Sequence, residues 1–234
     1  TYYADQDFVD VPAEGLLSKE YAKQRALEID LGSASLDYIA GDPLPFDSKV
    51  NSWPYWKAGE QMAAASLSDA VTDFPESLKD TSHIAIIDKD GNVFDATPSG
   101  GWIGGAVILG ETGIGMSIRG EQFWLDKQKA AQLRPWSRPR YTLTPSIVFK
   151  GGEALMAIGT PGGDNQEQTI LQSFLNVVEF WPDWYPNLHE AFEWPRVQTL
   201  HFYQSFWPHT TGFNRVNMEI GIGQDVIDEM RNLG

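Results

Sequence analysis

Three stretches of the chain repeat apolar residues with the period of an α-helix. Residues 18–29, SKEYAKQRALEI, have apolar residues about one turn apart, and Ser18 is the expected N-cap. A final short helix is expected in residues 223–234, GQDVIDEMRNLG. Residues 166–180, QEQTILQSFLNVVEF, predict the strongest amphipathic helix, with one apolar stripe made of Ile170, Leu171, Phe174, Leu175 and Val178.

Other stretches have the pattern of strands and tight turns. Residues 83–88, HIAIID, are nearly continuously apolar, which predicts a strand buried on both faces. The Asp90-Gly91 pair that follows favours a hairpin turn, and residues 92–99 return as the partner strand. A second hairpin is expected to turn at Gly151-Gly152. Strands joined by hairpins, with helices gathered after them, predict an α+β fold of antiparallel sheets layered with helices.

Glycine-rich and proline-rich stretches separate these elements. GAVILG and TGIGMSI, within residues 105–118, are expected to be further strands interrupted by glycines. Residues 32–60 are rich in Gly, Pro, Ser and Asp, which predicts a long irregular segment that is either functional or mobile.

Composition limits the class of protein. The 234 residues are 42% hydrophobic, enough for one large domain or two small ones with a sizeable core. A net charge of −15 disfavours nucleic acid and anionic membrane as partners, because both bind basic surfaces. No apolar run approaches the roughly 20 residues of a membrane span, and the first residues do not have the pattern of a signal peptide. The absence of cysteine excludes disulfides and thiolate chemistry and favours, without fixing it, a periplasmic or secreted location.

Metal binding is not predicted by any motif. Residues 88–92, DKDGN, begin like a calcium loop, but no glutamate follows at the required spacing, so a hairpin turn is expected. His189, His201 and His209 do not have metal-ligand spacing, and structural roles are expected for all three. Nine tryptophans, several beside proline, either line an aromatic cleft or pack loops.

The turn Pro161-Gly162-Gly163-Asp164-Asn165 lies between an expected strand and the amphipathic helix. Adjacent glycines let backbone N–H groups approach a ligand, and the helix N-terminus adds a positive dipole, so the turn could hold an oxyanion or a carboxylate. The alternative is a tight strand-to-helix turn in which Asp164 or Asn165 caps the helix.

Residues 80–83, Asp-Thr-Ser-His, place hydroxyls at the mouth of the first expected strand. Cleavage of the Asp80–Thr81 bond would give a threonine whose own α-amine acts as base, with a pKa of roughly 7.7–8.0. The Thr81 hydroxyl could make that cut by attacking the carbonyl of Asp80, forming an ester that water releases. Otherwise His83 acts as base for Thr81 or Ser82, or the stretch is only a polar strand end.

Four blocks in order make the pattern specific: TSHIAIIDKDGN, GETGIGMSIRGEQF, RPRYTLTPSIV and GTPGGDNQEQTILQSFLNVVEF. In this order they resemble the γ-glutamyltransferase family of N-terminal-nucleophile hydrolases. A fifth block, residues 7–26, looks like the end of that family's large subunit, so residues 1–80 are expected to be large-subunit-like. Residues 81–234 look like most of the small, catalytic subunit, and the two parts are expected to form one joint domain.

The resemblance implies a four-layer αββα sandwich, self-cleavage between Asp80 and Thr81, and Thr81 as the nucleophile of amide-cleaving acyl transfer. It assigns Ser99 as the hydroxyl that hydrogen-bonds the nucleophile, and Gly162 and Gly163 as the oxyanion-hole pair. It implies a small amide or peptide substrate and no cofactor. It also implies that the chain is incomplete, and that its partner is the remainder of its own precursor, which supplies the large N-terminal portion and the final strands.

The substrate-binding positions depart from the family pattern. Gly101 stands where γ-glutamyl-binding members carry Asn, and Gln122 stands in place of an acidic residue. Tyr141-Thr142 replaces a Ser-Ser pair. Arg119 and Arg140 are the basic candidates for a substrate carboxylate, with surface or structural ion pairs as the alternative role.

These departures predict weak activity on γ-glutamyl amides, because the holders of the substrate ammonium are altered. Three readings stay open: a γ-glutamyl or related acyltransferase, a cephalosporin-acylase-like hydrolase of non-glutamyl amides, and a catalytically silent binding homologue. The oligomeric state is not indicated by the sequence.

Overall fold

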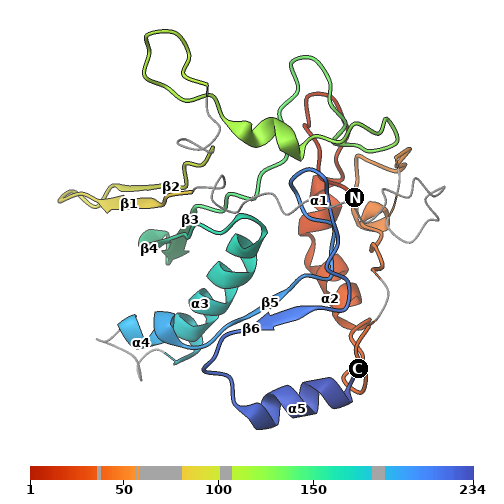
Figure 1. The fold of residues 1–234 in the computed structure, drawn as a ribbon, viewed down its shortest axis with the longest axis vertical. Coiled ribbons are helices and arrows are strands. Elements are labelled where there is room, and N and C mark those ends of the chain that lie inside the picture. The colour runs from red at the N-terminus through yellow and green to blue at the C-terminus, as the bar shows by residue number, and fades with distance from the viewer. Residues whose placement is uncertain (36–37, 56, 58–80, 101–106, 181–187) are drawn as a thin grey trace.

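The computed structural model describes residues 1–35, 38–55, 57, 81–100, 107–180 and 188–234 (Figure 1). Within them, helices and two-stranded antiparallel sheets form an α+β arrangement, as predicted. The sheets described are separate hairpins, so the four-layer sandwich stays a prediction.

The N-terminal helical region is two short helices, α1 (Ala13–Leu17) and α2 (Lys19–Ala26), followed later by the 3-10 turn η1 (Leu44–Phe46). Ser18 caps α2 as predicted, and its Oγ accepts a hydrogen bond from the Tyr21 N–H at 3.1 Å. The helix ends at Ala26 instead of residue 29. Leu27 and the apolar residues after it are exposed, and Asp30 accepts N–H and O–H groups just beyond, which turns the chain.

Both predicted hairpins form. β1 (Ile84–Ile87) pairs with β2 (Val93–Ala96), and the Asp88 carboxylate accepts the N–H groups of Asp90 and Asn92 across the turn, both at 2.9 Å. β3 (Ser146–Lys150) pairs with β4 (Glu153–Ile158) through Gly151 and Gly152, whose φ angles of 63° and 90° favour glycine.

Further strand structure differs from the prediction. β5 (Val197–Thr199) and β6 (Val216–Met218) form a third hairpin that the sequence pattern did not indicate. Residues 107–118 contain an isolated bridge between Ile108 and Gly115 in place of the two expected strands, because glycines interrupt the ladder.

The C-terminal half contains α3 (Gln166–Phe180), α4 (Leu188–Glu193) and α5 (Gln224–Asn232). α3 packs against α4 and β5, and it buries Gln166, Ser173 and Val177. The predicted helix is confirmed over residues 166–180, and Leu171, Leu175 and Val178 of its apolar stripe are exposed in the described part of the chain. The helix therefore turns a more polar face towards the described elements than its sequence suggests.

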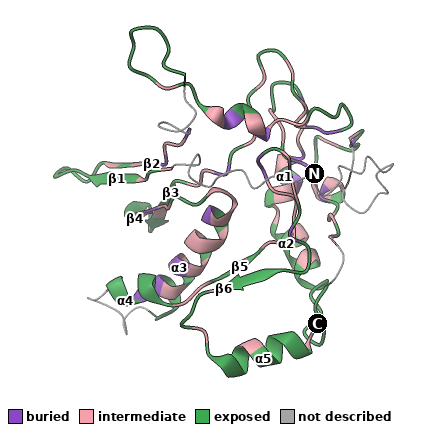
Figure 2. Ribbon diagram, viewed as in Figure 1, coloured by how far each residue is buried: buried purple, intermediate pink, exposed green. Residues whose placement is uncertain are grey.

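The clearest apolar core lies in the N-terminal part of the fold. Tyr2, Val9, Trp53 and Ala130 are buried together, with the Tyr2 and Trp53 rings 4.8 Å apart. By contrast, β1 is exposed along its whole length, and β2 is mostly half-buried (Figure 2). The prediction that β1 is buried on both faces is wrong for this part of the chain, because the two-stranded sheet has no described layer over those side chains.

An ion pair fastens the first residues to a distant loop. Arg138 Nη2 lies 2.6 Å from Asp5 Oδ1 and 2.6 Å from Asp7 Oδ2. Hydrogen bonds from the Arg138 side chain and backbone hold the pKa of Asp5 well below its usual range.

No helix among the described residues is long and apolar enough to cross a membrane.

Candidate functional site

Thr81 and Ser99 lie opposite each other at the open end of the first hairpin. The register that pairs Ile84 with Ala96 continues outward to an isolated antiparallel bridge between Thr81 and Ser99. Their hydroxyl oxygens, Oγ1 and Oγ, are 2.7 Å apart, a hydrogen-bond distance. The Ser82 N–H also donates to the Pro98 carbonyl at 2.9 Å. The hairpin therefore brings the predicted nucleophile and the predicted second hydroxyl into contact, while Asp80 lies outside the described residues.

Arg119 joins this pair from the 3-10 helix η3 (Ile118–Gln122). Its Nη2 donates to Ser99 Oγ, and its Nη1 donates to Thr142 Oγ1 at 3.1 Å. With the Gln122 amide oxygen turned towards Arg119, that oxygen accepts from Nη1 at 3.0 Å and the amide nitrogen donates to the Arg140 carbonyl. Ser99, Arg119, Gln122 and Thr142 thus form one hydrogen-bonded cluster behind Thr81.

The cluster is buried and carries a positive charge. Gln122 and Thr142 have no exposed surface, and Arg119 is only 6% exposed. Burial lowers the pKa of the Arg119 guanidinium, an effect opposed by the more distant carboxylates of Asp164 and Glu121. Within the described residues, no carboxylate lies at ion-pair distance from Arg119, so the expected alternative role in a structural ion pair is not seen there.

The Pro161–Asn165 turn reaches the same cluster through Phe206. The Phe206 ring centroid is 5.0 Å from Arg119 Cζ, and a Cβ built on Gly163 would lie 3.7 Å from the edge of that ring. Gly162 and Gly163 have φ angles of 134° and 56°, which L side chains rarely adopt. Gly163 begins η4 (Gly163–Asn165), which leads directly into α3.

Asp164 anchors this turn instead of capping α3. Its carboxylate accepts the Ser205 N–H at 2.9 Å and also accepts the Ser205 hydroxyl. Ser205 has no exposed surface, so the anchor is held inside the protein. Phe206, Ser205 and the anchoring role of Asp164 were not predicted from the sequence, since no local motif marks them.

His83 is engaged away from the Thr81 hydroxyl. Its Nδ1 lies 3.2 Å from Thr97 Oγ1 and its Nε2 lies 3.5 Å from Asp95 Oδ2. Its ring packs tightly against Gly159, at the end of β4. This geometry disfavours His83 as the base for Thr81, and it brings the segment that leads into the Pro161–Asn165 turn beside the first hairpin.

The remaining predicted substrate-binding residues separate into two groups. Thr142, Gln122 and Arg119 belong to the cluster described above. Tyr141 is 55% exposed and the described contacts do not place it there, while Gly101 lies outside the described residues.

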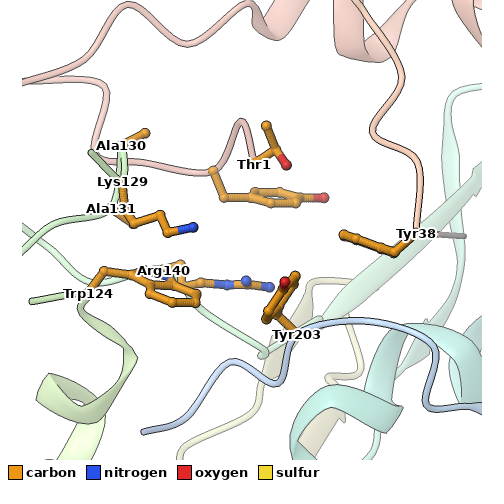
Figure 3. A pocket seen from close by; sticks show the side chains of 9 residues that line it. Thr1, Tyr38, Trp124, Lys129, Ala130, Ala131, Arg140 and Tyr203 are labelled. Atoms are coloured by element: carbon orange, nitrogen blue, oxygen red, sulfur yellow. The ribbon is translucent and has the colours of Figure 1, made fainter. Parts of the chain in front are cut away.

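Arg140 points into a separate pocket (Figure 3). Its Cζ lies 5.3 Å from the Tyr3 ring centroid, and Lys129 enters the same space from another loop. Aromatic rings of Tyr38, Trp124 and Tyr203 face the two cations (Figure 3). Burial lowers the pKa of Lys129 to about 8. Of the tryptophans that either line a cleft or pack loops, Trp124 lines this pocket, together with Tyr3, Tyr38 and Tyr203.

The three histidines expected to be structural have protein partners. His209 stacks on Trp124 at 3.9 Å, His189 contacts Glu193, and His201 accepts the Asn214 N–H. Among the described side chains, no group of three or more His, Cys, Asp or Glu is placed to hold a metal ion.

Comparison with known sequences gives a consistent set of relatives. The family model for gamma-glutamyltranspeptidase matches residues 1–234. A glutathione hydrolase proenzyme of Bacillus subtilis subsp. natto is 27% identical over 235 residues, covering 100% of this chain and 35% of the relative. The glutathione hydrolase-like YwrD proenzyme of Bacillus subtilis is 35% identical and covers 75% of this chain and 27% of the relative. An acylase ACY 1 proenzyme of a Pseudomonas strain is 28% identical, covering 84% of this chain and 29% of the relative.

Solved structures agree with the fold. The structure of LmbA2991T421A aligns with a TM-score of 0.79 and 31% identity, covering 100% of this chain and 38% of that chain. The Helicobacter pylori gamma-glutamyltranspeptidase T380A mutant aligns over 65% of this chain and 81% of that chain, with a TM-score of 0.50 and 22% identity, which supports the fold alone. The chain spans about a third of the length of the curated relatives that it matches.

Proposed function

This chain belongs to the gamma-glutamyltranspeptidase family, and we propose that it carries the nucleophile of an autoprocessing amide hydrolase or acyltransferase. The nucleophile is the hydroxyl of Thr81. The observation that carries the proposal is the 2.7 Å contact between Thr81 Oγ1 and Ser99 Oγ, backed by a buried guanidinium.

Processing uses the same hydroxyl as turnover. Thr81 Oγ1 attacks the carbonyl carbon of Asp80, the peptide C–N bond breaks, and the chain is held by an ester between Asp80 and Thr81. Water hydrolyses the ester, which leaves a carboxyl group on Asp80 and an α-amine on Thr81. That amine then serves as the base for the neighbouring hydroxyl.

In turnover, the Thr81 hydroxyl attacks the substrate carbonyl and passes its proton through the α-amine to the leaving group. Because Arg119 donates to Ser99 Oγ, the Ser99 proton is directed away from the guanidinium and is available to Thr81 Oγ1. The N–H groups of Gly162 and Gly163 stabilise the tetrahedral oxyanion, each by about 3–4 kcal/mol in typical sites. The acyl group on Thr81 then passes to water or to an amine, and no cofactor takes part.

We propose that the two parts of this chain are arranged as in the gamma-glutamyltranspeptidase family. We assign residues 1–80 to the large-subunit-like part and residues 81–234 to the catalytic part of one αββα sandwich, completed by the remainder of the precursor. The substrate is a small amide or peptide. A location outside the cytoplasm stays a prediction.

The acyl group is the open point of this proposal. Gln122 is a neutral residue in the buried cluster, and Tyr141 and Gly101 depart from the family pattern, so we expect weak activity on γ-glutamyl amides. The acylase ACY 1 relatives support the alternative of a non-glutamyl amide hydrolase. A catalytically silent homologue is the third reading.

Mass spectrometry of the full-length protein tests the nucleophile. We expect two chains that meet between Asp80 and Thr81, and one uncut, inactive chain for Thr81→Ala. Thr81→Ser, which keeps a hydroxyl, is the matched control and should still be cut. Normal cleavage and turnover by Thr81→Ala would remove Thr81 from its role and redirect attention to Ser82, and an uncut wild-type chain without activity would favour the silent homologue.

A further inference from the structure

The carboxylate of Asp164 joins the Gly162-Gly163 turn to a distant part of the chain. It accepts both the N–H and the hydroxyl of Ser205, a residue 41 positions away. Ser205 has no exposed surface, so its two hydrogen bonds are formed inside the protein, where they are stronger than at the surface. This pair of hydrogen bonds, the Asp164–Ser205 clasp, therefore fixes the end of the turn.

The turn has little else to fix its shape. Gly162 and Gly163 both have positive φ angles, and glycine loses more conformational freedom than any other residue when it is held in one conformation. A Cβ built on Gly162 would meet only the Asn165 side chain among the described residues, at 3.7 Å, so packing around this glycine is loose. Oxyanion donors are effective only when they already point at the oxygen, because reorganisation during the reaction is costly. Two adjacent glycines thus need an anchor outside the turn.

The other end of the clasp is rigid. Ser205 lies in residues 204–209, and the Trp207 N–H in this segment donates to the Glu121 carbonyl of η3 at 2.8 Å. His209 Nδ1 lies 2.9 Å from the Gln204 carbonyl, and its Nε2 lies 3.1 Å from the Phe123 carbonyl. The 204–209 segment is therefore bound at several points to η3 and to the residue that follows it.

The same segment reaches the nucleophile from its other side. η3 carries Arg119, which donates to Ser99 Oγ, and Ser99 Oγ lies 2.7 Å from Thr81 Oγ1. The Phe206 ring lies between the two parts of the site, 5.0 Å from Arg119 Cζ and within contact distance of a Cβ built on Gly163. One short segment thus holds both the cluster behind the nucleophile and, through the clasp, the glycine turn.

We propose that Asp164 is a positioning residue for catalysis, which acts through Ser205 to keep the N–H groups of Gly162 and Gly163 aimed at the oxyanion formed at Thr81. This inference rests on the proposed function of Thr81 and of the two glycines. Asp164 itself neither touches the substrate nor transfers a proton. Its effect lies in the rate of the chemical step, beyond the stability that a buried hydrogen bond gives to the fold.

The test measures kcat and KM of the processed full-length enzyme on the most active of three p-nitroanilides: acetyl, glutaryl and γ-glutamyl. Mass spectrometry gives the cleaved fraction, to which kcat is normalised. Loss of one oxyanion donor lowers kcat by about 100- to 1,000-fold in a typical enzyme. Asp164→Ala misaims the donors without removing them, so we expect kcat to fall by about 10- to 100-fold. KM should stay within about threefold, because the ground-state amide does not use these donors fully.

Two further variants test whether Asp164 acts through Ser205. Asp164→Asn keeps one acceptor oxygen, and its kcat should lie between those of Asp164→Ala and wild type. Ser205→Ala removes the hydroxyl but keeps the N–H, so it should slow turnover less than Asp164→Ala does. The double variant Asp164→Ala/Ser205→Ala should be no slower than Asp164→Ala alone, because both substitutions break the same contact.

Asp47→Ala is the matched control. The Asp47 carboxylate also accepts N–H groups, from Gly15 in α1 at 3.0 Å and from Val50 at 2.8 Å, so its loss breaks a comparable anchor in the N-terminal part of the fold. This variant should lower the melting temperature and leave kcat within about twofold of wild type. It separates a general loss of stability from misplacement of the glycine turn.

The outcomes distinguish this inference from the proposed function. If Thr81→Ala is inactive but Asp164→Ala keeps kcat within about twofold of wild type, the clasp is only structural and the inference is wrong, while Thr81 keeps its role. An equal fall in kcat for Asp47→Ala, or a double variant slower than Asp164→Ala, also overturns it. If Thr81→Ala turns over like wild type, or if the wild type is uncut and inactive on all three amides, the proposed function fails and the inference fails with it. If Asp164→Ala does not fold, Asp164→Asn and Ser205→Ala decide, since both should lower kcat at an unchanged KM.

Discussion

Replacement of Ser99 by alanine removes one oxygen atom that two other groups use. Thr81 Oγ1 loses a partner at 2.7 Å, and Arg119 Nη2 loses its acceptor. A hydrogen bond to a charged group contributes about 1.5–3 kcal/mol, and one between neutral groups contributes about 0.5–1.5 kcal/mol. Because Arg119 is 6% exposed, water replaces the lost acceptor poorly.

We therefore expect two separate effects of Ser99→Ala. Loss of the contact to Thr81 should lower kcat by about 10- to 100-fold, since each tenfold corresponds to about 1.4 kcal/mol. The donor left without an acceptor should lower the free energy of unfolding by about 1–3 kcal/mol. Precursor cleavage, followed by mass spectrometry over time, should slow together with kcat because both reactions use the Thr81 hydroxyl.

Ser99→Thr is the matched control, since it keeps the oxygen and adds one methyl group. It should retain cleavage and most of the turnover. Cleavage and turnover of Ser99→Ala within twofold of wild type would show that the Thr81–Ser99 contact has no part in either reaction. A stability loss without a kinetic loss would reduce Ser99 to a structural partner of Arg119.

Three other changes test the surroundings of the site. Gly163→Val should abolish turnover, because a φ of 56° is strained for a branched residue by about 1–2 kcal/mol or more. A variant that keeps its kcat while its melting temperature collapses would contradict an oxyanion role for Gly163. Asp164→Asn should weaken the anchor to Ser205 by about 1–2 kcal/mol in urea unfolding, and an unchanged midpoint would show that the anchor is dispensable. Arg138→Gln should destabilise the fold at neutral pH but not in strong acid. Arg138 depresses the pKa of Asp5, so the stability that the ionised Asp5 contributes is present above its ordinary pKa of 3.8 and is lost as the pH falls through its pKa in the folded protein. Equal destabilisation at pH 7 and in strong acid would contradict that assignment.

Local chemistry explains the elements that the sequence predicted correctly. The Asp90-Gly91 and Gly151-Gly152 turns form because their glycines accept positive φ angles, and the first turn is also held by the Asp88 carboxylate, a near neighbour in the chain. Ser18 caps α2 for the same reason. Such features need no knowledge of the rest of the fold.

Burial depends on distant partners and was predicted less well. The sequence of β1 is that of a strand covered on both faces, and the stripe of α3 is that of a helix packed along Leu171 and Leu175. Both surfaces are exposed in the described part of the chain, since only β2 pairs with β1 and since α3 packs through Ser173 and Val177. An apolar pattern shows that a face favours burial, but not which element lies over it.

The candidate site depends both on local turn chemistry and on packing against distant parts of the chain. The position of Ser99 opposite Thr81 follows from the register that the Asp90-Gly91 turn sets, because each residue outward from Ile84 is matched by one residue outward from Ala96 until Thr81 faces Ser99. A slip of one residue in that turn would send one of the two hydroxyls to the other face of the hairpin. The position of Arg119 and Phe206 beside this pair has no such local cause, since Arg119 comes from η3 and Phe206 from a distant loop, and both are positioned by packing. The nucleophile and its hydroxyl partner are thus encoded by a hairpin, whereas the buried guanidinium that donates to Ser99 is positioned by the tertiary fold.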